Sequence, residues 1–234
     1  MNEPVDLAFD GPLAIVTLNN PPLNIFDLAM RDELIQAFSA VDDVSDVRVM
    51  ILRSEGRHFS AGADLREFGS ASSITEARRI RWDRDPWGPL WDLRVPTIAA
   101  MRGTALGSGL EMSMLCDLRV AATNTTVGLP ETKLGMLPAA GGTQSLTRAV
   151  GPHGALPVVL DANPISAADA LARGIVHAVV DDVDDEARRW ATALATSDPA
   201  TVRAARRCLR AAGDLPLDAG LAVERRLATA LARR

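Results

Sequence analysis

Tyrosine is absent from the 234 residues, and cysteine and histidine are rare. The two cysteines, Cys116 and Cys208, are too few for a framework of disulfide bonds, so we expect free thiols. His58, His153 and His177 stand far apart and form no recognisable metal-ligand pair, so we predict no metal site. No apolar run approaches the roughly 20 residues that cross a bilayer, so we expect no membrane partner.

Basic residues form no stripe with interleaved aromatics, and the formal net charge is −5. Both properties argue against a nucleic-acid partner. The first thirty residues contain acidic residues, asparagines and prolines, and they lack the basic start and apolar core of a secretory signal. We therefore expect a cytoplasmic protein. Hydrophobic residues make up 47% of the chain, which is long enough to bury one sizeable core.

Strand-like and helix-like segments alternate through residues 1–182, which predicts a layered α/β core. The predicted strands cover residues 5–9, 13–18, 47–52, 95–101, 118–122 and 175–180. Asp27 is expected to cap the first helix because apolar residues recur at helical spacing after it. Residues 183–234 are predicted as three helices. The expected organisation is a core at 1–182 and a helical C-terminal region at 183–234.

An arginine- and tryptophan-rich segment occupies residues 75–93, where Pro86 and Pro89 are expected to interrupt a helix. Its members are Arg78, Arg79, Arg81, Arg84, Trp82, Trp87 and Trp91. The interpretation we favour is a solvated helix face that the tryptophans anchor. The alternative is a lid over a ligand that carries negative charge.

Several catalytic motifs are incomplete or missing. Residues 107–112 begin like a dinucleotide-binding fingerprint, but the third glycine is absent. The sequence contains no phosphate-binding loop that ends in Gly-Lys-Ser/Thr. Neither Ser60 nor Ser108 lies in a Gly-x-Ser-x-Gly elbow, and no histidine is placed beside either by a motif, so a serine hydrolase is disfavoured.

A glycine-rich turn at residues 103–109 precedes a predicted apolar helix. The first N–H groups of a helix lack internal partners, and the helix dipole adds positive potential, so this turn suits an oxyanion. The alternative is a turn that serves only close packing. The loop at residues 59–64 offers a second N–H, with an ordinary tight turn as its alternative.

Two carboxylates stand out near these turns. Glu111 lies in the first turn of the predicted apolar helix, and Glu131 follows Pro130. Each could be a simple helix-terminal acid that matches the dipole. Two carboxylates in one cavity can instead divide general acid and base roles when their surroundings separate their pKa values.

Three segments, in this order, resemble those of the enoyl-CoA hydratase/isomerase (crotonase) family. The first resembles the family's oxyanion loop and reads Phe59-Ser60-Ala61-Gly62-Ala63-Asp64-Leu65. The second, residues 103–117, is similar to the second oxyanion segment with the first catalytic glutamate, Glu111. The third, residues 128–138, is similar to the segment of the second glutamate, Glu131. Residues 141–151 and 166–179 resemble the helix after it and a later helix–strand unit.

The resemblance implies a spiral of ββα units with a helical C-terminal region, assembled as a homotrimer or homohexamer. It implies an acyl-CoA thioester as substrate, with coenzyme A as part of that substrate and no separate cofactor. The N–H groups of Ala63 and Ser108 would bind the thioester oxygen. Glu111 would hold and activate water, and Glu131 would exchange a proton at the α-carbon. Further substrate contacts are expected from Ala61, Asp64, Leu65, Gly109 and Pro130.

We therefore predict an enoyl-CoA hydratase, a lyase that adds water across the α,β double bond. The alternatives are an enoyl-CoA isomerase that uses Glu131 alone and a catalytically silent acyl-CoA-binding subunit. Three departures from the family pattern bear on the choice. Ser108 stands where the family usually has glycine, the sequence stops where relatives continue through a last helix, and residues 21–24 lack the basic residue that many relatives place near the adenine nucleotide.

Overall fold

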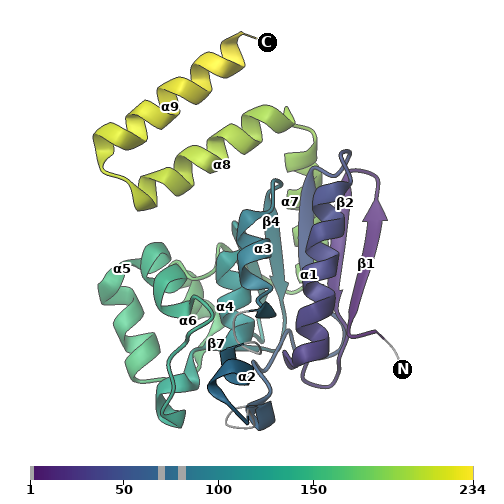
Figure 1. Cartoon of the computed structure of the whole chain (residues 1–234), viewed down its shortest axis with the longest axis vertical. Helices are drawn as coiled ribbons and strands as arrows, with labels where there is room; N and C mark the ends of the chain where they lie inside the picture. Colours follow the sequence, from purple (N-terminus) through teal and green to yellow (C-terminus); the bar gives the residue numbers. More distant parts are fainter. Residues whose placement is uncertain (1–2, 68–71, 79–82, 234) are drawn as a thin grey trace.

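The computed structural model describes residues 3–67, 72–78 and 83–233. Two sheets and the helices around them form the body of the molecule (Figure 1). The strands are β1 (Val5–Asp10), β2 (Leu13–Leu18), β3 (Val49–Ser54), β4 (Thr97–Met101), β5 (Thr104–Leu106), β6 (Leu118–Ala122), β7 (Thr126–Gly128), β8 (Ile165–Ser166) and β9 (Ala178–Val180). The α-helices are α1 (Leu28–Asp43), α2 (Ile74–Arg78), α3 (Trp87–Asp92), α4 (Ser108–Leu115), α5 (Gly142–Leu160), α6 (Ala167–Ala172), α7 (Val183–Ala195), α8 (Pro199–Asp214) and α9 (Leu217–Ala232). Short 3₁₀ helices occupy Leu65–Glu67 and Pro130–Leu134.

The larger sheet has six strands in the order β1-β2-β3-β4-β6-β9. Strands β1 and β2 form the predicted antiparallel hairpin, and the other neighbours run parallel. Gly11 adopts φ +56° in the hairpin turn, a conformation that glycine tolerates at little cost. The predicted cap is confirmed, because the Asp27 carboxylate accepts the Met30 N–H at 2.9 Å.

A repeated unit connects the two sheets. Strand β4 of the larger sheet leads into β5 and then α4, and β6 likewise leads into β7 and then α5. Strands β5 and β7 pair in parallel in the smaller sheet, whose order is β5-β7-β8. This succession is the expected ββα arrangement. The turn predicted at residues 103–109 therefore contains strand β5. Helix α5 is broken at Gly151, whose backbone is not helical (φ +72°, ψ 165°), so a first helix ends there and a second continues to Leu160.

Both faces of the larger sheet are covered. Strand β3 is almost wholly buried, as expected for a parallel strand with layers on both sides. One face packs under α1, α3 and α4, and the other face packs under α7 through Val183, Ala187 and Ala191. Helix α7 is thus part of the body. The boundary predicted at residue 183 falls inside this layer, and the chain leaves the body only after α7.

Helices α8 and α9 form a hairpin that stands beyond the body in Figure 1, with the C-terminus at its far end. Asp117 anchors α8 to the body, since its carboxylate accepts from Arg206 at 2.7 Å and from Arg210 at 3.2 Å. Leu217 and Leu221 of α9 are 79% and 39% exposed, so they do not pack on the body of this chain. Leu227 and Leu231 line a hollow between α8 and α9.

The arginine- and tryptophan-rich segment is only partly described. Arg79, Arg81 and Trp82 lie outside the described residues. Arg78 is exposed, and Arg84 pairs with Asp32 at 3.5 Å. Pro86 is the N-cap of α3 and Pro89 lies in its first turn, where a backbone N–H has no helical acceptor to lose. Trp87 is buried and Trp91 is 36% exposed, so α3 is anchored through its tryptophans.

Candidate active site

A cavity of about 450 Å³ lies where the segments singled out by sequence meet. It is lined by Ala61, Gly62, Ala63, Leu65, Gly107, Ser108, Glu111, Pro130, Glu131, Leu134, Met136, Leu137 and Ala139. The lining combines two carboxylates with backbone and mostly apolar side chains. This is the usual character of a small-molecule site, in which a few polar groups are placed on an apolar surface.

The loop that carries Ala61 and Ala63 is held by a segment far away in sequence. Ala61 N–H donates to the Leu23 carbonyl at 2.9 Å, and Phe26 N–H donates to the Gly62 carbonyl at 2.9 Å. The fully buried Asn24 side chain donates to the His58 carbonyl at 2.7 Å. Asn24 was missed by the sequence reasoning, although an asparagine two residues after the Pro-Pro turn was a visible signal.

Gly107 is one of the positions in the turn at residues 103–109 that require glycine. Its backbone has φ +51° and ψ −125°, and an added Cβ would lie 2.8 Å from Glu131 Oε1. Ser108 begins α4 with no positive φ, so serine carries no backbone strain there. The departure from the family's glycine at residue 108 therefore leaves the backbone N–H in place.

The N–H groups of Ala63 and Ser108 belong to the two turns that border the cavity. Within the part of the chain that the structure describes, neither N–H has a hydrogen-bond acceptor. The turns approach closely, since a Cβ on Gly62 would lie 3.0 Å from the Leu106 carbonyl oxygen and 3.6 Å from the Ser108 nitrogen. Two backbone donors at such a junction could stabilise an oxyanion.

Glu111 is held in the wall of the cavity by hydrogen bonds. It is 2% exposed, and its Oε1 accepts the Ala140 N–H at 2.8 Å and the Gly142 N–H at 2.9 Å. The Ser108 hydroxyl donates to Oε2 at 3.3 Å. A Cβ at residue 142 would lie 2.9 Å from Oε1, so glycine permits this close approach. Charge-assisted hydrogen bonds of this kind fix a carboxylate in one orientation.

Glu131 occupies a different environment in the same cavity. Its pKa is raised from the ordinary 4.5 to about 7. Burial is the largest cause; a backbone hydrogen bond lowers the pKa in part, and the nearby charge of Glu111 adds a smaller increase. Its buried Oε2 has no hydrogen-bond partner among the described residues. At neutral pH a carboxyl group with this pKa can both give and take a proton.

Two predicted substrate contacts are not among the residues that line the cavity. The Asp64 carboxylate pairs instead with Arg66 at 2.6 Å, and this guanidinium lowers its pKa. Gly109 faces the protein interior, where a Cβ would lie 2.8 Å from Ser60. Ala61, Leu65 and Pro130 do line the cavity. The apolar wall from Leu134, Met136, Leu137 and Ala139 was not predicted.

Within residues 3–67, 72–78 and 83–233, no group of three or more His, Cys, Asp or Glu side chains is arranged to hold a metal ion. Across those same ranges, every helix is too short or too polar to cross a bilayer. The chemistry available at the cavity is that of two carboxylates and backbone donors.

Comparison with known proteins assigns this arrangement to a class. An enoyl-CoA hydratase from Bacillus anthracis superposes with a TM-score of 0.93 at 30% identity, covering 99% of this chain and 92% of that one. The fold is therefore the crotonase fold, as expected. A probable enoyl-CoA hydratase (echA8) of Mycobacterium tuberculosis is 38% identical over 93% of this chain and 85% of its own length. The 2,3-dehydroadipyl-CoA hydratase of Escherichia coli is 37% identical over 93% and 86%.

The family model for enoyl-CoA hydratase/isomerase matches residues 9–234. The chain belongs to this family and is an enzyme of the hydratase/isomerase type.

Proposed function

We propose that the enzyme adds water reversibly across the α,β double bond of an enoyl-CoA thioester. The observation that carries this proposal is that Glu111 and Glu131 line one cavity beside the N–H groups of Ala63 and Ser108, for which the described residues offer no acceptor. Coenzyme A belongs to the substrate, and the reaction needs no further cofactor. The names of the hydratases to which the chain is similar support the same activity.

In this mechanism, the N–H groups of Ala63 and Ser108 donate to the thioester oxygen. Their hydrogen bonds draw electrons from the double bond, so the β-carbon becomes electrophilic and the enolate that forms is stabilised. Each such donor is worth about 3 kcal/mol of transition-state stabilisation in other enzymes. Backbone donors suit this role because the surrounding structure holds them before the substrate arrives.

The two glutamates have separate roles in the proposed reaction. Glu111, fixed by the Ala140 and Gly142 N–H groups, holds the water and aligns it with the β-carbon. The water oxygen forms the new C–O bond, one O–H bond breaks, and a proton is delivered to the α-carbon. Glu131, with a pKa of about 7, exchanges that proton. Glu111 is fixed by two backbone N–H groups, whereas Glu131 Oε2 has no hydrogen-bond partner among the described residues, and this difference supports the division of labour.

Isomerisation with Glu131 alone is the competing reaction. It moves a proton between two carbons and needs no group that holds water. The firm attachment of Glu111 at the cavity favours hydration. A catalytically silent binding protein is disfavoured, because serine at residue 108 leaves the helix start unstrained.

The test is Glu111→Gln assayed with a 2-enoyl-CoA, with products identified by mass spectrometry. Glutamine keeps an oxygen for the Ala140 and Gly142 N–H groups, so we expect hydration to fall by at least 10²-fold while thioester binding persists. The loss of the charge near a helix start costs at most about 1 kcal/mol of stability. Glu224→Gln, on the exposed face of α9, is the matched control. A folded Glu111→Gln enzyme that hydrates at the normal rate contradicts the mechanism, and a normal enzyme that only shifts double bonds is an isomerase.

We further propose a homotrimer or homohexamer. The supporting observation is the hairpin of α8 and α9, which leaves Leu209, Leu217 and Leu221 exposed by 76%, 79% and 39%. Exposed apolar side chains on one helical hairpin are typical of an interface between subunits.

A further inference from the structure

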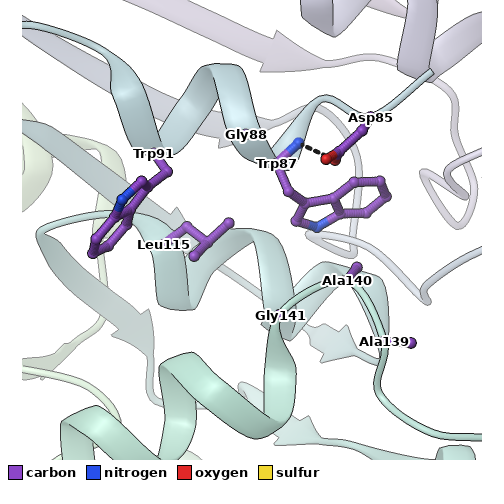
Figure 2. A pocket seen from close by; sticks show the side chains of 8 residues that line it. All are labelled: Asp85, Trp87, Gly88, Trp91, Leu115, Ala139, Ala140 and Gly141. Carbon is purple, nitrogen blue, oxygen red and sulfur yellow. Dashed lines mark hydrogen bonds between the residues drawn. The ribbon is translucent and has the colours of Figure 1, made fainter. Parts of the chain in front are cut away.

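A second cavity of about 270 Å³ adjoins the proposed active site (Figure 2). Trp87 and Trp91 of α3 form one side, with Leu115 at the end of α4 between them. The segment 139–141 forms the opposite side. Ala139, an exposed residue, lines both cavities, so they adjoin at this position.

The segment between the cavities also holds Glu111. The N–H groups of Ala140 and Gly142 bind the Glu111 carboxylate, while Ala140 and Gly141 face the second cavity. The second cavity therefore lies one backbone thickness from the proposed reaction centre. A group attached beyond the β-carbon of a substrate could pass over Ala139 and reach it.

The two indoles are held in place before any ligand binds. The Arg210 guanidinium lies 3.8 Å from the centre of the Trp91 ring, and it also donates to the Trp91 carbonyl. Trp87 packs against the Phe26 ring at 5.9 Å between centroids. The opposite side consists of alanine and glycine, so the space beside the indoles is broad. Because these side chains are already ordered, binding a ligand group beside them costs little conformational entropy.

The Trp87 indole carries an unused donor. Trp87 is 7% exposed, and its Nε1–H has no acceptor among the residues described. In Figure 2 this edge of the indole faces Ala140 across the cavity. A buried donor without an acceptor is costly, and the face of an aromatic ring is a weak acceptor for N–H. Aromatic pairs also favour edge-to-face contacts of this kind.

We infer that the second cavity receives the distal end of the acyl group, and that this end carries an aromatic ring. A ring fills the broad space beside the indoles and offers its face to the Trp87 N–H. A linear alkyl chain of similar length offers no acceptor and contacts less of each indole. Asp85 at the edge of the cavity disfavours a negatively charged end. This inference rests on the proposed function only in placing an acyl-CoA in the first cavity.

Calorimetric binding of saturated thioesters tests the inference, because these ligands bind without reacting. The probes are butyryl-CoA, decanoyl-CoA and 6-phenylhexanoyl-CoA. We expect the phenyl compound to bind at least ten-fold tighter than butyryl-CoA and several-fold tighter than decanoyl-CoA. Trp91→Leu should remove the preference for the ring over the linear chain and leave butyryl-CoA binding unchanged. Trp91→Phe, which restores a ring, should recover most of it.

Trp190→Leu, a matched exchange in α7 outside both cavities, should retain the preference. The inference is overturned if decanoyl-CoA binds as tightly as the phenyl compound, if Trp91→Leu and Trp91→Phe both leave the preference intact, or if no thioester binds. Hydration assays are separate. A ring preference without hydration overturns the proposed function alone, and hydration without a ring preference overturns this inference alone.

Discussion

The Glu131→Gln enzyme should be more stable than the native enzyme at alkaline pH and equally stable at acid pH. Burial raises the pKa of Glu131 from 4.5 to about 7, so folding disfavours its charged form. Below pH 4.5 the Glu131 carboxyl group is protonated in both the folded and the unfolded chain, so its burial does not lower the stability. As the pH rises from 4.5 to 7, the unfolded chain loses this proton first, so the native enzyme loses stability. Above pH 7 the loss is complete and constant.

The size of the effect follows from the same values. At 1.36 kcal/mol for each pKa unit, the difference between 4.5 and about 7 sets an upper limit of about 3.4 kcal/mol. Glu131 is only partly buried, and solvent screening reduces this to about 1–2 kcal/mol. Glutamine is neutral and nearly the same size, so the substitution removes the penalty. For a chain of this length, Tm at pH 8 should rise by about 2–8 °C.

The assay is thermal unfolding of both enzymes at pH 5 and pH 8, with turnover measured in parallel. Turnover of Glu131→Gln should fall by about 10²–10⁴-fold, the usual share of a general acid–base group. Glu224→Gln should show no pH-dependent gain in Tm. An equal Tm difference at both pH values would refute the proposed burial penalty, and normal turnover would remove Glu131 from the mechanism.

The remaining predictions concern the turn, the C-terminal anchor and the assembly. Gly107→Ala should cut turnover and lower the free energy of unfolding by about 2–3 kcal/mol, because the positive φ and the contact with the Glu131 carboxylate act together. Gly135→Ala is the control, because residue 135 has φ +70° but no atom lies within 4 Å of the added Cβ. In chemical denaturation it should cost only about 1 kcal/mol. Equal losses of stability in the two variants would contradict the proposed clash at residue 107. Asp117→Asn should weaken the attachment of α8 to the body and lower the free energy of unfolding by about 1–3 kcal/mol. The hairpin of α8 and α9 should then be cleaved faster by a protease. An unchanged cleavage rate would show that the contact of Asp117 with Arg206 and Arg210 is dispensable. Light scattering at micromolar concentration should show a trimer or hexamer, whereas a monomer contradicts the proposed role of Leu217 and Leu221.

Local signals in the sequence predicted most of the secondary structure. The hairpin turn, the Asp27 cap and the three C-terminal helices follow from turn residues, capping chemistry and apolar spacing, which act over a few neighbours. Strand β5 was missed because its three residues lie among glycines and pair with β7 and with Ser60, both more than twenty residues away in the chain. The membership in the family was also readable, because several motifs occur in the right order.

The candidate site was predictable in its parts. The positions of Glu111 and Glu131 beside glycine turns were visible in the sequence, and so were the alternatives of simple helix-terminal acids. The structure brings both into one cavity but turns Gly109 toward Ser60 and pairs Asp64 with Arg66. These directions depend on how each turn is packed, which residue type and spacing do not specify.

By itself, the sequence determined most of the helices and the longer strands, the glycine turns and the two carboxylates, because these rest on local conformation and residue chemistry. Only the tertiary structure decided that backbone N–H groups anchor Glu111 and that burial raises the pKa of Glu131, since burial and hydrogen bonding arise from segments distant in the chain. It also decided that α7 covers the sheet and that two tryptophans border a cavity beside Ala139. Such neighbours are brought together by packing across the whole fold, which no short stretch of sequence records.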